Sequence, residues 1–493
     1  MDVIAWSRLQ FAMTAAYHWL FVPFTLGVAM VMAVMETLYV VREDEFWKKT
    51  AQFWMKLFAI NFAVGIATGI ILEFEFGTIW SNYSWFVGDL FGAPLAIEGI
   101  LAFFMEATFF AVMFFGWDKV GKRFHLVSTW LTGIGATISA YWILVANGWM
   151  QNPVGTTFNP DTVRSEMASA AAFWEVISNP VAVSKFFHSV TSGWVTGGVF
   201  VVGISCWYLL KKRQRKFAKA SILVGSIVGI VGSFAVMLSG DSSGIHAAEF
   251  QPMKLAAAEG LENGGRRAAF TIVPGIQIPG MLSILATHDI NGYVPGINDI
   301  LNGYTDNEGN VIPSVSEKMA MGREALAALS LYRTTDDPSE KAEARHALEK
   351  NVQYMGYGHL EKPEDVIPPV GVVFWAFRLM VGLGMLLLLE LLVIGFLAWK
   401  DRLDGKKWLF IAAILCIPLV YLCGQAGWVV AEVGRQPWTI QGLLPVNVAI
   451  SSLSAGAVKT TFFLFLAIFS LFLIIELRIM IEAIRKGPET PNE

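Results

Sequence analysis

The chain has 493 residues, of which 55% are hydrophobic and 15% are charged, and its formal net charge is −4. Average soluble domains carry about 25% charged residues, so this composition excludes an ordinary soluble protein. The sequence has no Gly-rich phosphate-binding loop, which disfavours a nucleotide-driven pump, and its three cysteines stand in apolar runs without the spacing of a metal site.

Long apolar runs recur along the chain, and a helix that crosses a membrane needs about 20 such residues. Nine runs meet this requirement, at residues 11–41, 52–80, 92–117, 126–149, 185–210, 219–240, 370–399, 407–431 and 459–483. We expect the first run to be a membrane helix and not a cleaved signal, because it is too long and no small-residue cleavage site closes it.

A polar stretch separates the sixth and seventh runs. Residues 255–368 contain segments such as TDNEGN and DDPSEKAEARHALEK, and they are too many for a tight connection. The sequence therefore predicts an all-α polytopic membrane protein in three parts. Residues 1–254 carry six helices, residues 255–368 form a large extramembrane loop, and residues 369–493 carry three helices.

The short loops differ in their content of Lys and Arg, which indicates orientation. Basic loops read VREDEFWKKT, DKVGKRFH, KKRQRKFAK and KDRLDGKK, and the C-terminal region carries Arg485 and Lys486. They alternate with loops that are poor in Lys and Arg, such as SNYSWFVGDLFG. We expect the basic loops and the C-terminus in the cytoplasm, and the N-terminus and residues 255–368 outside.

Ionisable or metal-ligating residues inside apolar runs are costly and commonly functional. In chain order, those that fall near the outer face are His18, Glu98, His188, Met380 and Glu432, and Glu106 lies deeper. Each has a plainer interpretation, since membrane histidines bridge helices, methionine fills cores, and Glu432 can pair with Arg435. His125, beside Lys122 and Arg123 at a helix end, is interpreted as interfacial.

Iron porphyrin explains this set better than a helix-bridging network. Haem iron accepts His or Met as axial ligands, and its propionates require cations when they are held in low dielectric. Such cations stand near the candidate ligands at Arg8, Lys185, Arg378 and Arg435. No CxxCH motif is present, so any haem is bound non-covalently. A secondary transporter is the other class considered, but its sites lie at the midplane on repeated, interrupted helices, and no such repeat is evident.

Several blocks of sequence, in order, resemble subunit I of the cytochrome bd quinol oxidases. They include SRLQFAMTAAYHWLFVPFTLG, EFEFGTIWSNYSWFVGDLFGAPLAIEGILAFFMEATF, ILVANGWMQNPVG, GDSSGIHAAEFQPMKLAAAEG and GRQPWTIQGLLP. The resemblance covers essentially the whole chain and implies three haems near the outer face. His188 and Met380 then match the ligands of haem b558, and Glu432 matches a ligand of haem b595. His18 matches the ligand of haem d, with Glu98 near its other side, although family members exchange the positions of haems b595 and d.

The resemblance also implies a reaction. Residues 255–368 match the family's Q-loop in its long form, and Lys254 and Glu259, with Gln251 nearby, match residues tied to quinol oxidation. The implied enzyme is a quinol:oxygen oxidoreductase that reduces dioxygen to water and builds a proton gradient without pumping, in the bacterial cytoplasmic membrane. Glu106 is the candidate for inward proton transfer.

Further expectations accompany this hypothesis. Ser139 and Asn147 are added to the inward proton route, and Trp428 is expected to pack against a porphyrin. The expected protein partners are subunit II and, in addition, a small single-helix subunit. Membrane quinol and dioxygen are the expected substrates, and no nucleic acid is expected. The alternative is a haem subunit that transfers electrons without oxygen reduction, which would leave His18 and Glu432 unexplained.

Overall fold

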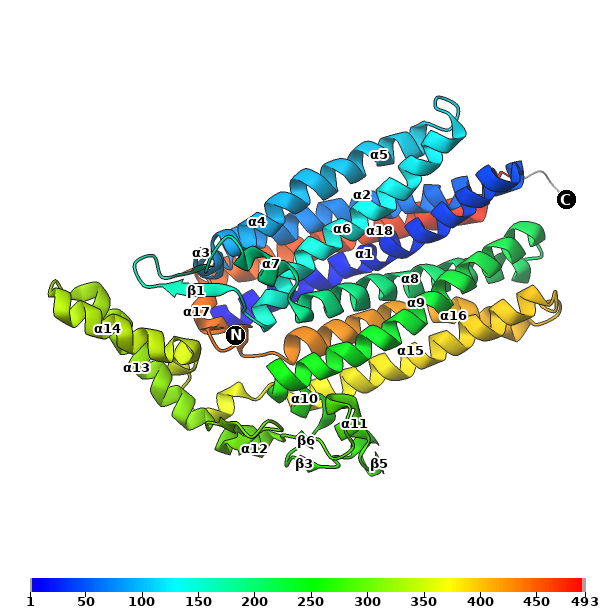
Figure 1. The fold of residues 1–493 in the computed structure, drawn as a ribbon. Helices are drawn as coiled ribbons and strands as arrows, with labels where there is room; N and C mark the ends of the chain where they lie inside the picture. The colour runs from blue at the N-terminus through cyan, green and yellow to red at the C-terminus, as the bar shows by residue number, and fades with distance from the viewer. Residues whose placement is uncertain (1, 490–493) are drawn as a thin grey trace.

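The computed structural model describes residues 2–489, and helices dominate it (Figure 1). Within that range nine helical spans are long and apolar enough to cross a membrane, which confirms the predicted number. The long continuous helices are α1 (Val3–Arg42), α2 (Glu45–Thr78), α6 (Lys122–Gln151), α8 (Pro180–Leu210), α9 (Arg215–Phe250), α15 (Val370–Trp399), α16 (Lys407–Trp428) and α18 (Ala455–Lys486).

Two of the spans contain a π-helical turn. The third span is composed of α4 (Asp89–Ile97), the π-helical turn η1 (Glu98–Phe103) and α5 (Phe104–Phe115). The eighth span is α16 continued by the π-helical turn η4 (Val429–Val433). A π-helical turn holds one more residue than an α-helical turn, and such turns are frequent at functional sites.

Short elements fill the connections. The helical ones are α3 (Ser81–Val87), α7 (Ala172–Ile177), α10 (Pro252–Glu259), α11 (Met281–Thr287), α12 (Ile297–Asn302), α13 (Val315–Thr334), α14 (Pro338–Asn351), η2 (Val352–His359), η3 (Pro363–Val366) and α17 (Val446–Ala449). The strands form antiparallel pairs: β1 (Thr156–Asn159) with β2 (Arg164–Met167), β3 (Gly265–Arg266) with β6 (Tyr293–Val294), β4 (Phe270–Val273) with β5 (Ile276–Ile278), β7 (Tyr304–Thr305) with β8 (Val311–Ile312), and β9 (Trp438–Ile440) with β10 (Leu444–Pro445).

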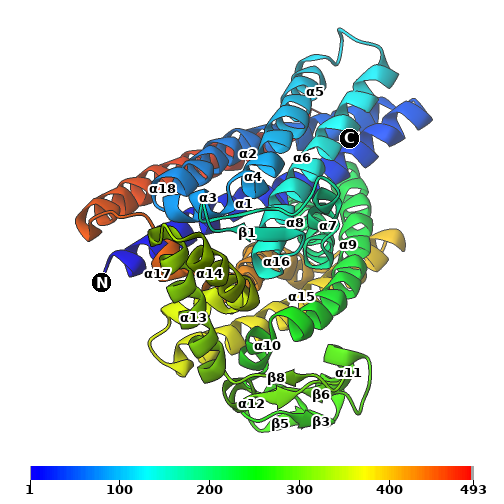
Figure 2. The same cartoon turned by 60° about the vertical axis from the view of Figure 1, so that its left-hand side comes forward.

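The two ends of the helix bundle differ in character. The elements from α10 to α14 cap one end, next to the start of α1, and we call this the loop end (Figures 1 and 2). The connections at the opposite end are short and rich in Lys and Arg, and α18 finishes there; we call it the basic end. Ion pairs such as Lys48–Asp118 join the start of α2 to the connection before α6 at the basic end.

Close helix contacts through glycine hold the centre of the bundle. A Cβ atom on Gly27 of α1 would collide with the backbone oxygen of Gly193 and would lie 2.6 Å from the backbone nitrogen of Gly197, both on α8. Small residues allow this approach, which membrane helices use because apolar burial does not favour protein over lipid. This close contact holds α1, which carries His18, directly against α8, which carries His188.

The helices extend beyond the apolar runs that predicted them. The sixth run was expected to end at residue 240, but α9 continues to Phe250 through the polar segment GDSSGIHAAEF. The fifth run was expected to start at residue 185, but α8 begins at Pro180, where the side chain of Asn179 caps the helix. Hydrophobicity marks the part of a helix that lies in lipid, and backbone hydrogen bonds carry the helix further.

His125 lies in the first turn of α6, at a helix end as expected, but its environment is protein. Its side chain is buried, Nδ1 lies 2.6 Å from Glu36 Oε1, and Nε2 lies 2.9 Å from the backbone oxygen of Met113. Thr129 Oγ1 donates to the other Glu36 oxygen at 2.5 Å. Glu36 comes from α1, 89 residues earlier in the chain, so the pairing was not visible from the local sequence.

Candidate functional site

The four candidate iron ligands lie in the half of the bundle toward the loop end. His18 stands on α1, His188 on α8, Met380 on α15, and Glu432 in the π-helical turn η4. They come from four different spans, and α8 lies beside α1 and α16 in the packing of the bundle. Residues far apart in the sequence are thus brought to similar depths by helix packing.

Each of the two candidate histidines is hydrogen-bonded through one ring nitrogen to a neighbouring helix. His18 Nδ1 lies 3.0 Å from Thr68 Oγ1 on α2. His188 Nδ1 lies 3.3 Å from Ser239 Oγ on α9. Within the described chain no hydrogen bond reaches Nε2 of either residue, whereas both nitrogens of His125 have partners.

Glu432 is the centre of a charged network. Its Oε2 accepts a hydrogen bond from Arg435 Nε at 2.6 Å, and its Oε1 accepts one from Asn147 Nδ2 at 3.1 Å. Lys185 Nζ lies 3.8 Å from Glu432 Oε1 and donates to Asn147 Oδ1 at 2.5 Å. Two cationic side chains, Lys185 and Arg435, therefore surround a single carboxylate, that of Glu432.

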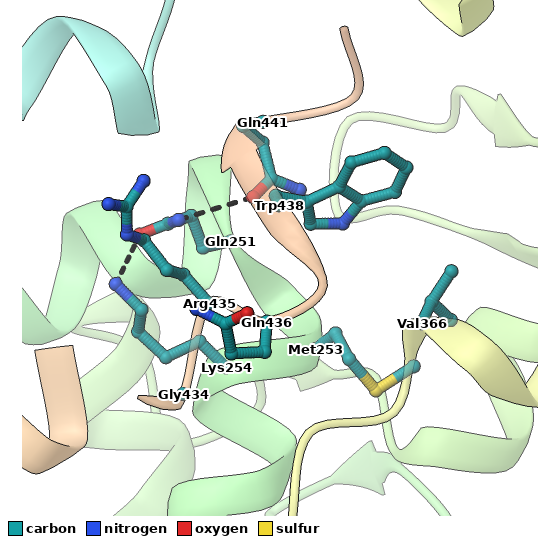
Figure 3. Close-up of a pocket in the computed structure, with 9 residues that line it drawn as sticks. All are labelled: Gln251, Met253, Lys254, Val366, Gly434, Arg435, Gln436, Trp438 and Gln441. Carbon is teal, nitrogen blue, oxygen red and sulfur yellow. Dashed lines mark hydrogen bonds between the residues drawn. The ribbon is translucent and has the colours of Figure 1, made fainter. Parts of the chain in front are cut away.

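Amide side chains extend this network to α10. Gln151 Nε2 donates to Asn147 Oδ1 at 3.0 Å, and Gln151 Oε1 accepts from Lys254 Nζ at 2.8 Å. Lys254 also donates to Gln251 Oε1 at 2.5 Å, and Gln251 donates to Gln441 at 3.2 Å (Figure 3). Lys254 is buried, and this burial, reinforced by the charge of Lys185, holds the pKa of its ammonium well below the ordinary value.

The pocket drawn in Figure 3 lies against this network. Its lining is Gln251, Met253, Lys254, Val366, Gly434, Arg435, Gln436, Trp438 and Gln441. It therefore joins α10 to the segment that follows η4. The sequence pointed to Lys254 and Arg435 here, but it gave no signal for Gln151 or Gln441, whose roles depend on partners far away in the chain.

Arg378, which was predicted to bind a haem propionate, also has a protein partner that its sequence position did not indicate. It stands two residues from Met380, and its guanidinium forms an ion pair with Glu259 at 2.7 Å. It also donates to the backbone oxygens of Ala258 and Thr271. Burial raises the pKa of the Glu259 carboxyl, and the charge of Arg378 opposes that rise. The structure thus joins Glu259 and Arg378, which sequence analysis had placed in separate sites.

Glu98 and Glu106 both face α6. Ser139 Oγ donates to Glu98 Oε1 at 2.7 Å. Glu106 is buried, and a Cβ atom on Gly135, one helical turn from Ser139, would lie 3.1 Å from Glu106 Cβ. Glu98 opens the π-helical turn η1, as Glu432 lies within η4, so each of these two candidate carboxylates occupies a π-helical turn.

Of the two remaining predicted residues, Trp428 lies at the candidate site and Arg8 lies outside it. Trp428 packs edge-on against Trp19, with ring centroids 5.0 Å apart, and Lys185 Nζ lies 5.7 Å from the Trp428 ring centroid. Arg8 stands near the start of α1 with an exposed side chain, outside the network around Glu432. Trp428 is therefore part of the candidate site in this structure, and Arg8 is not joined to it.

These features define a multi-pass membrane protein with candidate axial ligands and buried cations gathered at one end of its bundle. The family model for cytochrome bd terminal oxidase subunit I matches residues 6–488, and the chain belongs to this family. It is 41% identical over 516 residues to cytochrome bd-II ubiquinol oxidase subunit 1 of Escherichia coli (strain K12), covering 99% of this chain and 97% of that protein. It is 36% identical over 505 residues to cytochrome bd ubiquinol oxidase subunit 1 of Bacillus subtilis (strain 168), covering 100% and 96%.

The fold has a counterpart among solved structures. The bd oxidase from Geobacillus thermodenitrificans aligns with a TM-score of 0.79 and 24% identity over 99% of both chains. Together with the family match, this makes the chain a membrane-spanning oxidoreductase subunit of respiratory electron transport.

The residues fit the haem that this family implies. Among residues 2–489 no three His, Cys, Asp or Glu side chains converge as a metal site, but a porphyrin supplies four ligands itself and asks the protein only for axial ones. His18 and His188 offer Nε2, and a Cβ atom on Gly427 would lie 3.1 Å from Met380 Sδ. Lys185 and Arg435 exceed the charge of Glu432, which suits the propionates that haem brings.

Proposed function

We propose that the chain is the haem-bearing subunit of a terminal quinol oxidase, which oxidises membrane quinol and reduces dioxygen to water. The observation that carries the proposal is the continuous network from Lys254, through Gln151 and Asn147, to Glu432. It connects the short helix α10 to the candidate ligand in η4, so a quinol site and an oxygen site would share one electrostatic environment. The printed names of the two curated relatives, both ubiquinol oxidase subunits, support this proposal.

The haem assignments follow the resemblance in sequence. His188 and Met380 would hold haem b558, and His18 and Glu432 would hold haem d and haem b595 in one order or the other. Arg435 and Lys185 would bind propionates, and Trp428 would pack against a ring face. The bound haems supply the redox chemistry that moves electrons from quinol to dioxygen.

Lys254 and Glu259 would serve quinol oxidation. Both are buried on α10, where the lowered pKa of Lys254 and the raised pKa of Glu259 bring the two groups toward the range in which protons exchange near neutral pH. Arg378 would hold Glu259 in place through their ion pair. Together these side chains would orient a quinol hydroxyl and accept its protons.

Protons for water formation would enter from the other side of the membrane. The basic end is proposed to face the cytoplasm, as the positive-inside rule predicts, and the loop end to face outward. Glu106 would pass protons toward Glu98, which already accepts a hydrogen bond from Ser139. Release on one side and uptake on the other would build a gradient without a pump.

The proposed assembly contains further components. It includes a second large subunit and a small single-helix subunit in the bacterial cytoplasmic membrane. Quinol and dioxygen are the substrates.

The reduced-minus-oxidised optical spectrum of the purified complex tests the proposed function. We expect a low-spin b-type signal together with high-spin haem and a red-shifted haem d band. A low-spin signal alone would favour a subunit that only transfers electrons. A spectrum without a Soret band would refute haem binding altogether.

A further inference from the structure

The candidate ligands His18 and His188 each pack against a hydroxyl residue followed by a glycine on a neighbouring helix. We call each such pair, together with its contacts to the imidazole ring, a seat. His18 meets Thr68 and Gly69 of α2, and His188 meets Ser239 and Gly240 of α9. In each case a hydroxyl residue contacts Nδ1, and the glycine that follows it faces ring atom Cε1. A Cβ atom would lie 3.0 Å from Cε1 of His18 at Gly69 and 3.3 Å from Cε1 of His188 at Gly240.

The hydroxyl groups favour one position for the ring proton. Thr68 Oγ1 donates its single proton to its own helix, with the backbone oxygens of Gly65 and Val64 at 3.0 and 3.2 Å. Ser239 Oγ likewise lies 2.8 Å from the backbone oxygen of Ala235. With the hydroxyl proton directed to its own helix, the oxygen is the acceptor of the contact and Nδ1 of each histidine is the donor, which is the tautomer that the inference requires. Neutral imidazole then leaves the Nε2 lone pair free.

The glycines explain why the rings fit there. A side chain at Gly69 or Gly240 would press on the imidazole edge, because contacts of 3.0–3.3 Å are tighter than ordinary van der Waals contact. The absence of a Cβ atom therefore lets each ring lie against the neighbouring helix backbone while Nδ1 reaches the hydroxyl. The hydroxyl favours one tautomer, and the glycine fixes the position of the ring.

A hydroxyl–glycine pair does not by itself make such a seat. Thr132 and Gly133 on α6 form the same pair, with Thr132 buried and donating to the backbone oxygen of Ser128 at 3.0 Å. The nearest atom to a Cβ at Gly133 is Ala29 Cβ at 3.4 Å, which is helix packing. His246 also meets a hydroxyl, Ser184 Oγ at 3.0 Å, but its ring is not among the three atoms nearest to a Cβ at any described glycine.

We infer that Thr68 and Ser239 are positioning residues that hold His18 and His188 with Nε2 directed to haem iron, and that Gly69 and Gly240 set the ring positions. This inference rests on the proposed function, because it requires haem at both histidines. Hydrogen bonds to the outer nitrogen of a ligating histidine orient the ring and raise its basicity, and their loss commonly costs about 10–100-fold in affinity for the metal. Loss of either hydroxyl should therefore weaken the corresponding axial bond.

The test uses the purified oxidase complex and matched variants. Thr68→Val removes the hydroxyl at similar size, Thr68→Ser retains it, and Thr132→Val makes the same change at the pair without a histidine. In Thr68→Val the iron–histidine stretching band of the high-spin haem should fall in frequency, and the affinity for that haem should fall about tenfold. Thr68→Ser and Thr132→Val should match the wild type in both measurements.

The second seat is tested through the low-spin haem. Ser239→Ala should raise the midpoint potential of that haem, because a less basic ligand stabilises ferric iron less, and Ser239→Thr should restore it. Gly69→Ala should disturb its haem more than Gly240→Ala does, since the Cβ contact is 3.0 Å at the first position and 3.3 Å at the second.

The outcomes separate this inference from the proposed function. A wild-type complex without haem would overturn both. Haem present with unchanged vibrational bands and potentials in Thr68→Val and Ser239→Ala would overturn the positioning role alone. If Thr68→Val does not assemble, Gly69→Ala provides the same readout, and an unshifted band in that variant would count against the seat.

Discussion

Glu259→Gln should release α10 from α15. The carboxylate of Glu259 and the guanidinium of Arg378 form an ion pair at 2.7 Å, with only 3% and 9% of their side chains exposed. Glutamine keeps the size of the side chain but removes its charge. Arg378 would then be a buried cation without a carboxylate, retaining the backbone oxygens of Ala258 and Thr271 and the nearby ring of Phe374.

The size of the effect follows from this burial. Removing one partner of a buried ion pair costs about 3–5 kcal/mol, because the remaining charge is left uncompensated. Arg378 keeps two carbonyl partners, so we take the lower value, about 3 kcal/mol. Since about 1.4 kcal/mol corresponds to a factor of ten, local opening of α10 should become roughly 100-fold more frequent. The small cluster of Ala257, Ala258 and Val373 is the apolar contact that would still hold α10 to α15.

Hydrogen exchange measured by mass spectrometry on the purified complex would detect this opening. Amides of α10 and β4 should exchange roughly 100-fold faster in Glu259→Gln, while those of α13 and α14 should not change. Glu262→Gln, an exposed glutamate three residues further along, is the matched control. Quinol turnover should fall in Glu259→Gln while the haem bands remain intact. Unchanged exchange at α10 would refute the role of the ion pair, and unchanged turnover would refute the assignment of Glu259 to quinol.

Three further variants test separate parts of the proposed function. Met380→Leu should preserve packing but abolish the low-spin spectrum of haem b558, and a normal low-spin spectrum would remove Met380 as a ligand. Lys254→Ala should lower quinol turnover about tenfold or more with haem content retained; normal turnover in a fully haem-loaded enzyme would contradict its assignment. Glu106→Gln should retain haem but lower oxygen consumption about 100-fold, with a smaller loss in Glu106→Asp, and full oxygen consumption in Glu106→Gln would make Glu106 a scaffold residue.

The general architecture could be predicted from the sequence because it depends on local properties. Apolar runs of sufficient length gave the nine spans, and the placement of Lys and Arg matches the division between the basic end and the loop end. The ends of α8 and α9 could not be placed in this way, since polar residues outside the lipid continue the helices to Pro180 and Phe250.

Contacts between residues far apart in the chain could not be predicted from the sequence. His125 looked interfacial because its neighbours are basic, yet its partner Glu36 comes from another helix. Arg378 was predicted to bind a propionate because Met380 is close in sequence, and its ion pair with Glu259 of α10 was not foreseen. Gln151 was not singled out at all, since an amide becomes informative only when its partners are known. The roles of His18, His188 and Glu432 remain predictions that the spectra and variants above would test.

The π-helical turns at Glu98 and Glu432 have a consequence for how such a protein can change during evolution. In an α-helix, one inserted residue rotates everything beyond it by about 100° and would turn a packed face toward lipid. A π-helical turn absorbs the extra residue within itself, so the helix on either side keeps its register. Each turn thus separates the direction of its carboxylate from the packing of the remaining span. Deletion of a single residue from η1 or η4 should therefore be tolerated by the membrane fold while it redirects the carboxylate, so that these two short segments are places where insertions and deletions could alter the chemistry of the site without rebuilding the bundle.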